Sequence, residues 1–306
     1  MVSGYRSAIG RRTFRIANYS LLALLGLVTL YPFWFVIQAS FTDPVYRISY
    51  FWPKGFFYHN YYLMFTTEGL GQAYLITILR VVAAVPLMLV VTGSAAFALT
   101  RRELKGRKLI ITYYFITMFV SGGLIPSYML LKTIGLLDTF WVYVVPVVFS
   151  VWTMIVMKTS FQSLPDGLVE AALMDGANYG LIFFRIILPL SLPMVATLGL
   201  FSAVWHWNEW FMGAFYIKNP RLRPLQTFLR IAVLVPGNRA TYLSANAQKY
   251  TDIFTDDPRL IQQLVRITSE SMKLAFVTAT TVPILLVYPF IQRYFIKGVL
   301  IGSIKG

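Results

Sequence analysis

The chain has 306 residues, of which 57% are hydrophobic and 13% charged. Soluble domains average roughly 45–50% hydrophobic and about 25% charged residues. This composition excludes water as the sole solvent, and we expect a membrane protein. A net charge of +15 would suggest nucleic-acid binding in a soluble protein, but Lys and Arg gather on cytoplasmic loops of membrane proteins, and we expect no nucleic-acid partner. The absence of cysteine excludes disulfides and thiolate metal sites.

Apolar windows recur along the chain, each near the roughly 20 residues that a transmembrane helix needs. Backbone groups in hydrocarbon must be satisfied within the segment, and windows of this length form helices rather than barrel strands. The sequence therefore predicts an all-α, polytopic membrane protein, with a transmembrane domain at 16–306 in contact with lipid. Six spans are expected, at about 16–39, 73–99, 109–131, 140–157, 186–217 and 274–291.

The first window follows Arg6, Arg11, Arg12 and Arg15, as the apolar region of a signal peptide would. It is too long for that region and lacks a convincing cleavage site, so we interpret it as a retained span after a cytoplasmic segment 1–15.

Basic residues on the connecting segments predict the orientation, because they gather on cytoplasmic loops. The two short outer loops hold only Arg47, Lys54 and Lys132, whereas the segments expected inside are richer in Lys and Arg. The long segment 218–273 is left out of this comparison, because long loops translocate largely regardless of charge. Both termini, the loop 158–185 and the tail 292–306 are therefore expected in the cytoplasm. The segment 218–273 is expected outside as a small cap, with amphipathic helices at 225–235 and 260–267.

Two charged residues interrupt the apolar windows: Arg80 in the second and Glu209 in the fifth. A charge inside a span is costly, so Glu209 and Arg80 are candidates for the translocation pathway. The alternative is that Glu209 lies near the outer end of a long fifth helix, where it is wetted or forms an ion pair with Arg80. Asn208 and Trp205 beside Glu209 suit the binding of a sugar ring, although an interfacial belt or packing is the stronger interpretation of the tryptophans. His206 lacks companions at ligand spacing, and we expect no metal site.

The loop between the fourth and fifth windows carries clear helix signals. Ser163 and Asp166 fit a capping box with Pro165 in the first turn, Gly176 suits the left-handed residue that ends a helix, and Asn178 can cap the next one. Glu170 on this short helix could dock to another protein. From the residues alone, an ordinary interfacial connector is the stronger interpretation.

A resemblance favours docking. Glu-Ala-Ala, then three residues, Gly, nine residues and Ile-x-Leu-Pro is similar to the signature of binding-protein-dependent importer permeases. The matching residues are Glu170, Ala171, Ala172, Gly176, Ile186, Leu188 and Pro189, with Asp175 and Ala177 as the usual extension. Segments 97–101, 134–141, 207–210, 288–298 and 302–306 resemble the smaller, maltose-type permease of the carbohydrate-uptake ABC transporters.

The resemblance implies a non-enzymatic permease subunit of an ATP-driven ABC importer in the bacterial inner membrane. Implied partners are a second homologous permease, a cytoplasmic ATPase homodimer, an extracytoplasmic solute-binding protein and a carbohydrate solute. The Glu-Ala-Ala loop would couple closure of the ATPase dimer to alternating access. This chain would bind no cofactor, since ATP and Mg²⁺ belong to the ATPase; independently, it lacks a G-x-x-x-x-G-K-[ST] sequence.

The long 218–273 segment and Arg80 depart from the maltose-type pattern and resemble a branch associated with oligosaccharides, often acidic or plant-derived. The alternative is a permease of a non-sugar ABC importer, such as one for amino acids or metals. A membrane-embedded enzyme would need a His/Asp/Glu cluster on facing spans, and an ion-driven carrier would need more buried carboxylates than Glu209 alone.

Overall fold

The computed structural model describes residues 3–42, 49–231, 273–283 and 285–286. Across these ranges the regular structure is helical, apart from an isolated antiparallel bridge between Thr42 and Phe56. This confirms the all-α prediction. The chain divides into two compact units: Met1–Thr67 with Pro236–Val282, and Glu68–Val235 with Pro283–Gly306.

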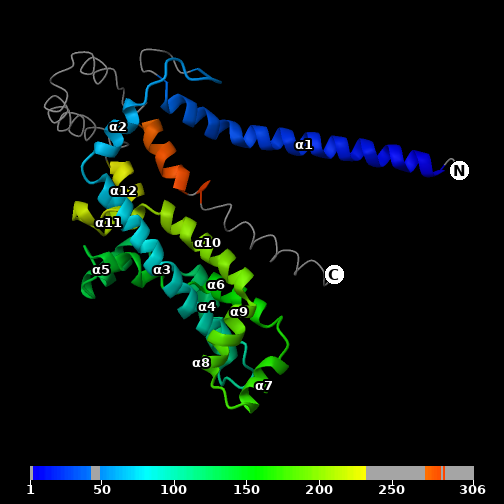
Figure 1. Cartoon of the computed structure of the whole chain (residues 1–306). Coiled ribbons are helices and arrows are strands. Elements are labelled where there is room, and N and C mark those ends of the chain that lie inside the picture. Colours follow the sequence, from blue (N-terminus) through cyan, green and yellow to red (C-terminus); the bar gives the residue numbers. More distant parts are fainter. Residues whose placement is uncertain (1–2, 43–48, 232–272, 284, 287–306) are drawn as a thin grey trace. The chain divides into compact units, whose positions relative to one another are not determined.

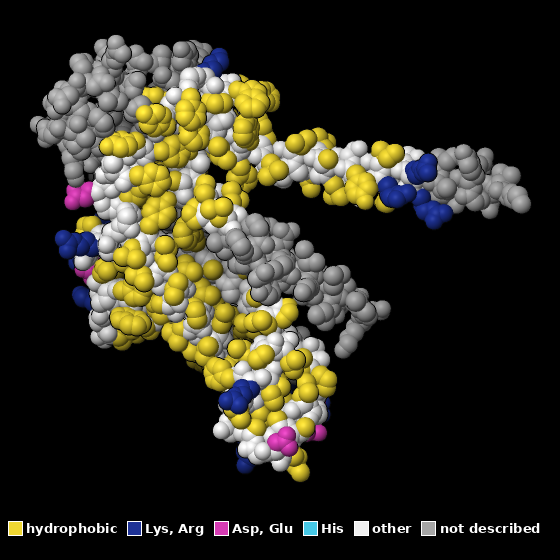
Figure 2. Space-filling view, in the orientation of Figure 1, with side chains coloured by type: hydrophobic (Ala, Val, Ile, Leu, Met, Phe, Trp, Pro, Cys, Tyr) yellow, Lys and Arg dark blue, Asp and Glu magenta, His cyan; other side chains and the backbone are white. Residues whose placement is uncertain are grey.

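The first unit contains α1 (Ser3–Ser40), a single helix that continues past Pro32 (Figure 1), and α2 (His59–Thr66). Figure 2 shows hydrophobic side chains along α1 and Lys or Arg side chains near its N-terminal end. The apolar side chains from Phe14 to Trp34 are largely exposed. A helix with apolar residues on all sides is suited to lipid rather than to water.

The aromatic segment after α1 folds back onto the end of that helix. Trp34 Nε1 donates to the carbonyl oxygen of Phe51 at 2.8 Å, and its ring meets Trp52 edge-on at 5.6 Å. Asn60 Nδ2 in α2 donates to the carbonyl oxygen of Ser40 at 3.1 Å. The bond from Asn60 satisfies the last carbonyl of α1.

The predicted sixth span, 274–291, is helical at 273–283 and at 285–286, and its remainder lies outside the described residues. The tail 292–306 and most of the segment 218–273, including the expected helix at 260–267, also lie outside them.

The second unit is built around α3 (Leu70–Ala98), which packs against α6 (Val151–Phe161) and α10 (Leu192–Asn208). In chain order the further elements are α4 (Arg107–Phe119), α5 (Leu124–Thr133), the 3₁₀ turns η1 (Phe140–Tyr143) and η2 (Val145–Val147), α6 (Val151–Phe161), α7 (Gly167–Met174), α8 (Tyr179–Ile182), the π-helical turn η3 (Phe183–Ile187), α9 (Leu188–Leu190), α10 (Leu192–Asn208), α11 (Phe211–Phe215), the 3₁₀ turn η4 (Pro220–Leu222) and α12 (Leu225–Leu229). The last lies within the predicted amphipathic helix 225–235 and packs on α3.

Among the described residues, Gly10–Ser40 and Leu70–Ala98 are long and apolar enough to cross a membrane unbroken, and three bent helix pairs raise the number to as many as five. The bends are 116° between Arg107–Phe119 and Leu124–Thr133, 48° between Phe140–Val147 and Val151–Phe161, and 85° between Tyr179–Leu190 and Leu192–Phe215. Three of the predicted windows thus contain a break in the helix.

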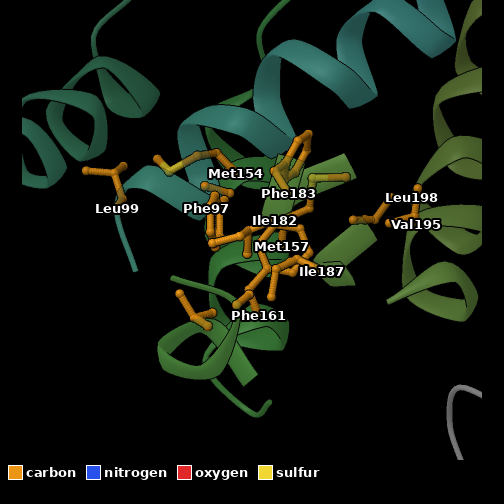
Figure 3. Packing of buried hydrophobic residues seen from close by; sticks show 13 residues of the cluster. Phe97, Leu99, Met154, Met157, Phe161, Ile182, Phe183, Ile187, Val195 and Leu198 are labelled. Atoms are coloured by element: carbon orange, nitrogen blue, oxygen red, sulfur yellow. The ribbon is translucent and has the colours of Figure 1, made fainter. Parts of the chain in front are cut away.

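A buried cluster joins α3, α6, α7, α8, η3 and α10 (Figure 3). Met154 and Met157 from α6 lie beside Phe97 at the end of α3, with Phe183 from η3 packed among them. Val195 and Leu198 extend the cluster onto α10. This cluster connects the short helices of the 158–185 segment to the long ones.

Candidate functional site

The helix α7 carries the predicted Glu-Ala-Ala motif and has one buried and one exposed face. Val169 and Ala172 are buried in the cluster of Figure 3. Glu170 and Ala171 are exposed, and Met174 is 88% exposed. Residues four apart lie on one helix face, so Glu170 and Met174 are neighbours there. Met174 was not among the residues that the sequence singled out.

The C-terminus of α7 is closed by the left-handed residue that was predicted. Gly176 has φ of 80°, its N–H donates to the carbonyl oxygen of Leu173 at 3.0 Å, and the N–H of Ala177 donates to that of Ala172 at 3.0 Å. These bonds form a Schellman motif, which satisfies the last carbonyls of the helix. Asp175, which directly precedes Gly176, is the C-cap residue of α7.

The predicted capping box at the start of α7 is wrong. The N-cap residue is Asp166, whose side chain makes no capping hydrogen bond, and the Ser163 hydroxyl donates to the carbonyl oxygen of Ser160 at 2.7 Å. A serine hydroxyl can bond the preceding turn as readily as the following one. Ser163 therefore belongs to the end of α6.

Asn178 caps the next helix as predicted, since its Oδ1 accepts from the N–H of Leu181 at 2.8 Å. The helix α8 runs into η3, which contains Ile186, and then into α9, which contains Leu188 and Pro189. The bend of 85° into α10 follows. The whole motif thus spans α7 to α9 and leads directly into a long apolar helix.

A close approach of α3 fixes this corner. A Cβ atom at Gly93 would lie 3.2 Å from Cζ of Phe183, and the rings of Phe97 and Phe183 stack with centroids 5.8 Å apart. Close-packed side chains of this kind make a protein interior difficult to compress. Phe183 of η3 is therefore packed without a gap against α3.

Arg80 and Glu209, which the sequence placed in separate windows, form an ion pair, so the paired alternative is confirmed. Nη1 of Arg80 lies 3.1 Å from Oε2 of Glu209, and the side chains are 1% and 8% exposed. Nη2 of Arg80 also donates to the carbonyl oxygen of Glu209 at 2.8 Å. A charge at such depth is tolerated when it is paired and hydrogen-bonded.

The pair lies at the break between α10 and α11. Glu209 is the C-cap residue of α10, and its Oε1 accepts from the N–H of Met212 at 2.8 Å, in the first turn of α11. The guanidinium of Arg80 also lies 5.3 Å from the ring centroid of Tyr143, whose hydroxyl donates to the carbonyl oxygen of Leu222 at 2.9 Å. The ion pair thus supplies hydrogen-bond partners for a carbonyl at the end of α10 and an N–H in the first turn of α11.

Trp205 and Asn208, the other pathway candidates, are exposed on α10, and Nδ2 of Asn208 donates to the carbonyl oxygen of Val204 at 2.9 Å. His206 is buried and meets the ring of Trp205 edge-on at 4.9 Å. Within the described part of the chain, no three or more His, Cys, Asp or Glu side chains are grouped to hold a metal ion.

Residues 68–301 match the family of binding-protein-dependent transport system inner membrane components. The chain belongs to this family. The match includes α7 to α9 and the Arg80–Glu209 pair.

The permease also resembles individual proteins along almost its whole length. It is 36% identical over 298 residues to protein LplC of Bacillus subtilis, covering 96% of both chains. It is 33% identical over 298 residues to the polygalacturonan/rhamnogalacturonan transport system permease protein YtcP of the same organism. This match covers 96% of this chain and 99% of that protein. A chain in the crystal structure of a bacterial ABC transporter involved in the import of the acidic polysaccharide alginate matches with a TM-score of 0.79 at 24% identity, covering 94% of this permease and 98% of that chain. This last likeness shows the importer permease fold.

Family membership makes the chain a multi-pass inner-membrane transport subunit and not an enzyme. Its complex includes an ATPase and a binding protein, and no cofactor is expected on the permease itself.

Proposed function

We propose that this permease imports a carbohydrate, specifically an oligosaccharide, across the bacterial inner membrane. The observation that carries the proposal is the similarity at 33% identity, over 96% of the chain, to a relative named for polygalacturonan and rhamnogalacturonan transport. The resemblance of the terminal segment to the carbohydrate branch favours the same solute class over an amino acid or a metal.

The proposed topology has six spans, with both termini and the loop 158–185 in the cytoplasm and the segment 218–273 outside. Two unbroken apolar helices and three bent pairs support five spans, and the window 274–291 supplies the sixth. The distribution of Lys and Arg supports the orientation.

We assign ATPase coupling to the motif residues from Glu170 to Pro189. The exposed face of α7, with Glu170, Ala171 and Met174, docks to one subunit of a cytoplasmic ATPase homodimer. Ala172 packs inward and transmits the movement to the buried cluster, and the segment from Asp175 to Ala177 fixes the angle to α8. Ile186, Leu188 and Pro189 carry the movement into α10.

The remaining partners are a second homologous permease and an extracytoplasmic solute-binding protein. ATP and Mg²⁺ are bound by the ATPase. On α10, Trp205 and Asn208 face the pathway, and Arg80 with Glu209 holds the helix break beside it.

The test is ATP hydrolysis by the complete complex in proteoliposomes, stimulated by its binding protein loaded with an oligogalacturonide or, as a neutral comparison, raffinose. Glu170→Lys and Gly176→Asp should leave the permease in the membrane and abolish the stimulation. Gln162→Lys, a charge on the same loop outside α7, should retain it. Normal stimulation in the first two variants would refute the coupling role, and no stimulation of the wild type by any oligosaccharide would refute the solute class.

A further inference from the structure

A cavity of about 410 Å³ opens beside the break between η2 and α6. It is lined from α10 by Phe201, Ser202, Trp205 and His206, and from α6 by Trp152 and Thr153. Its volume falls within the roughly 300–1,000 Å³ of small-molecule sites, which are mostly apolar with a few placed polar groups. None of these residues except Trp205 was singled out as a pathway candidate from the sequence.

The aromatic side chains stand at the wall of this cavity. Trp152, Phe201 and Trp205 are 51%, 50% and 48% exposed, so each ring has a free side. The ring of Trp205 meets that of the neighbouring His206 edge-on at 4.9 Å. Aromatic rings offer large, rigid contact area, and a pyranose ring presents a C–H face that matches it.

Hydroxyl and imidazole groups lie among these rings. Ser202, Thr153 and His206 can each donate or accept a hydrogen bond, as the hydroxyls of a sugar require. The described lining residues include no Asp, Glu, Lys or Arg, so the chemistry favours a neutral part of a solute over an ion.

The backbone at the same place is discontinuous. The segment Phe140–Val147 bends by 48° into α6, and Pro146 and Ser150 at this break also line the cavity. Irregular backbone at membrane depth is tolerated where it lines a cavity, and transporters build solute sites at broken helices. This observation is independent of the side chains.

We propose that the cavity between α6 and α10 is a solute subsite that binds one neutral pyranose ring of the transported oligosaccharide between Trp152 and Trp205. The inference rests on the proposed function and adds to it that this permease itself contacts the solute. Carboxylates of an acidic oligosaccharide would be bound elsewhere along the pathway.

Because the chain has no cysteine, single substitutions give a clean accessibility test. Ser202→Cys in the complete complex should react with a charged methanethiosulfonate reagent. A rhamnogalacturonan oligosaccharide, whose rhamnose rings are neutral, should slow this reaction when it is supplied on the binding protein. Ser94→Cys is the matched control, because it lines a separate cavity of about 450 Å³ with Phe97 and Tyr179. Its labelling should not respond to solute.

A functional pair of variants completes the test. Trp205→Ala should slow oligosaccharide import into proteoliposomes about two- to tenfold, the range of one aromatic contact, and Trp205→Phe should restore most of it. Trp141→Ala, an exposed tryptophan outside the cavity, should import normally.

The outcomes separate the subsite from the proposed function. If wild-type ATP hydrolysis responds to the oligosaccharide but Ser202→Cys is unreactive, the cavity is covered by lipid or the partner permease and the subsite is refuted. Equal protection of Ser202→Cys and Ser94→Cys would indicate a global change and also refute it. If the wild type responds to no oligosaccharide, the proposed function fails and the subsite with it.

Discussion

Arg80 and Glu209 are 129 positions apart in the sequence, and their side chains meet inside the protein at 3.1 Å. Glu209 ends α10 and accepts from the first turn of α11, while Arg80 binds both the carboxylate and the carbonyl oxygen of Glu209. A broken helix leaves carbonyl and N–H groups without helical partners. Arg80 and Glu209 supply hydrogen-bond partners for these backbone groups, so the ion pair stabilises the break between α10 and α11.

Removal of one charge should therefore be more harmful than removal of both. Arg80→Met or Glu209→Gln leaves a buried charge or polar group unpaired and should destabilise the complex by about 3–5 kcal/mol. The double variant should lose less stability than either single variant, because it leaves no charge buried without a partner. Thermal unfolding of the purified complex measures this; additive losses, or a stable Arg80→Met variant, would contradict the assignment.

The exposed end of α7 gives a second prediction. Met174 is 88% exposed beside Glu170, so a charge there should weaken docking without disturbing the permease core. Met174→Asp should lower the amount of ATPase co-purified with the permease by roughly tenfold or more, as loss of an interface hot spot does. Gln162→Asp places the same charge outside α7 and should retain the ATPase. Equal recovery from both variants would exclude Met174 from the interface.

Local signals in the sequence were sufficient for parts of this site. The positive φ of Gly176 and the cap at Asn178 depend on a few neighbouring residues, and both were predicted. The capping role predicted for Ser163 was wrong because its hydroxyl can bond either the following or the preceding turn. In the structure it donates to the preceding turn, at the carbonyl oxygen of Ser160.

Long-range geometry was not predictable in the same way. Hydrophobic windows indicate that a helix exists but do not give the angle at a break. The 85° bend before α10 lies at Ser191 and Pro193, which mark a place where a helix can break but do not fix the size of the bend. Trp152 and Trp205 lie in different windows, and only the folded chain brings them to one cavity. The ion pair was foreseen as an alternative because two charges in apolar windows have few other partners.

The contact between Gly93 and Phe183 gives a third prediction. A Cβ at Gly93 would lie 3.2 Å from the ring, so Gly93→Val should overpack this corner and cost about 1–3 kcal/mol. The smaller side chain of Phe183→Leu should relieve the clash and restore part of the stability in the double variant. Thermal unfolding of the four combinations gives the coupling energy. A coupling energy near zero would show that α3 and η3 do not constrain each other here.

Gly176 gives a fourth prediction, because its φ of 80° favours residues that tolerate the left-handed region. Gly176→Asn should be the mildest substitution, whereas Gly176→Ala should cost about 1 kcal/mol and a β-branched residue more. Both stability and stimulated ATP hydrolysis should follow the order Gly, Asn, Ala, Val. A Val variant with normal stimulated hydrolysis would show that the angle between α7 and α8 is not required for coupling.

Asp138 supports a fifth prediction, since it is the one described non-glycine residue with positive φ, at 59°. Its Oδ1 accepts from the N–H groups of Lys218 and Asn219 at 2.9 and 2.8 Å, and its own N–H donates to the carbonyl oxygen of Tyr216 at 2.9 Å. Asp138→Ala removes the shared acceptor and should cost about 1–3 kcal/mol. Asp138→Asn keeps an oxygen at this position and tolerates positive φ, so it should unfold close to the wild-type temperature. If the Ala and Asn variants melted together, the acceptor would not be what holds the two segments, and the backbone bond to Tyr216 would be sufficient.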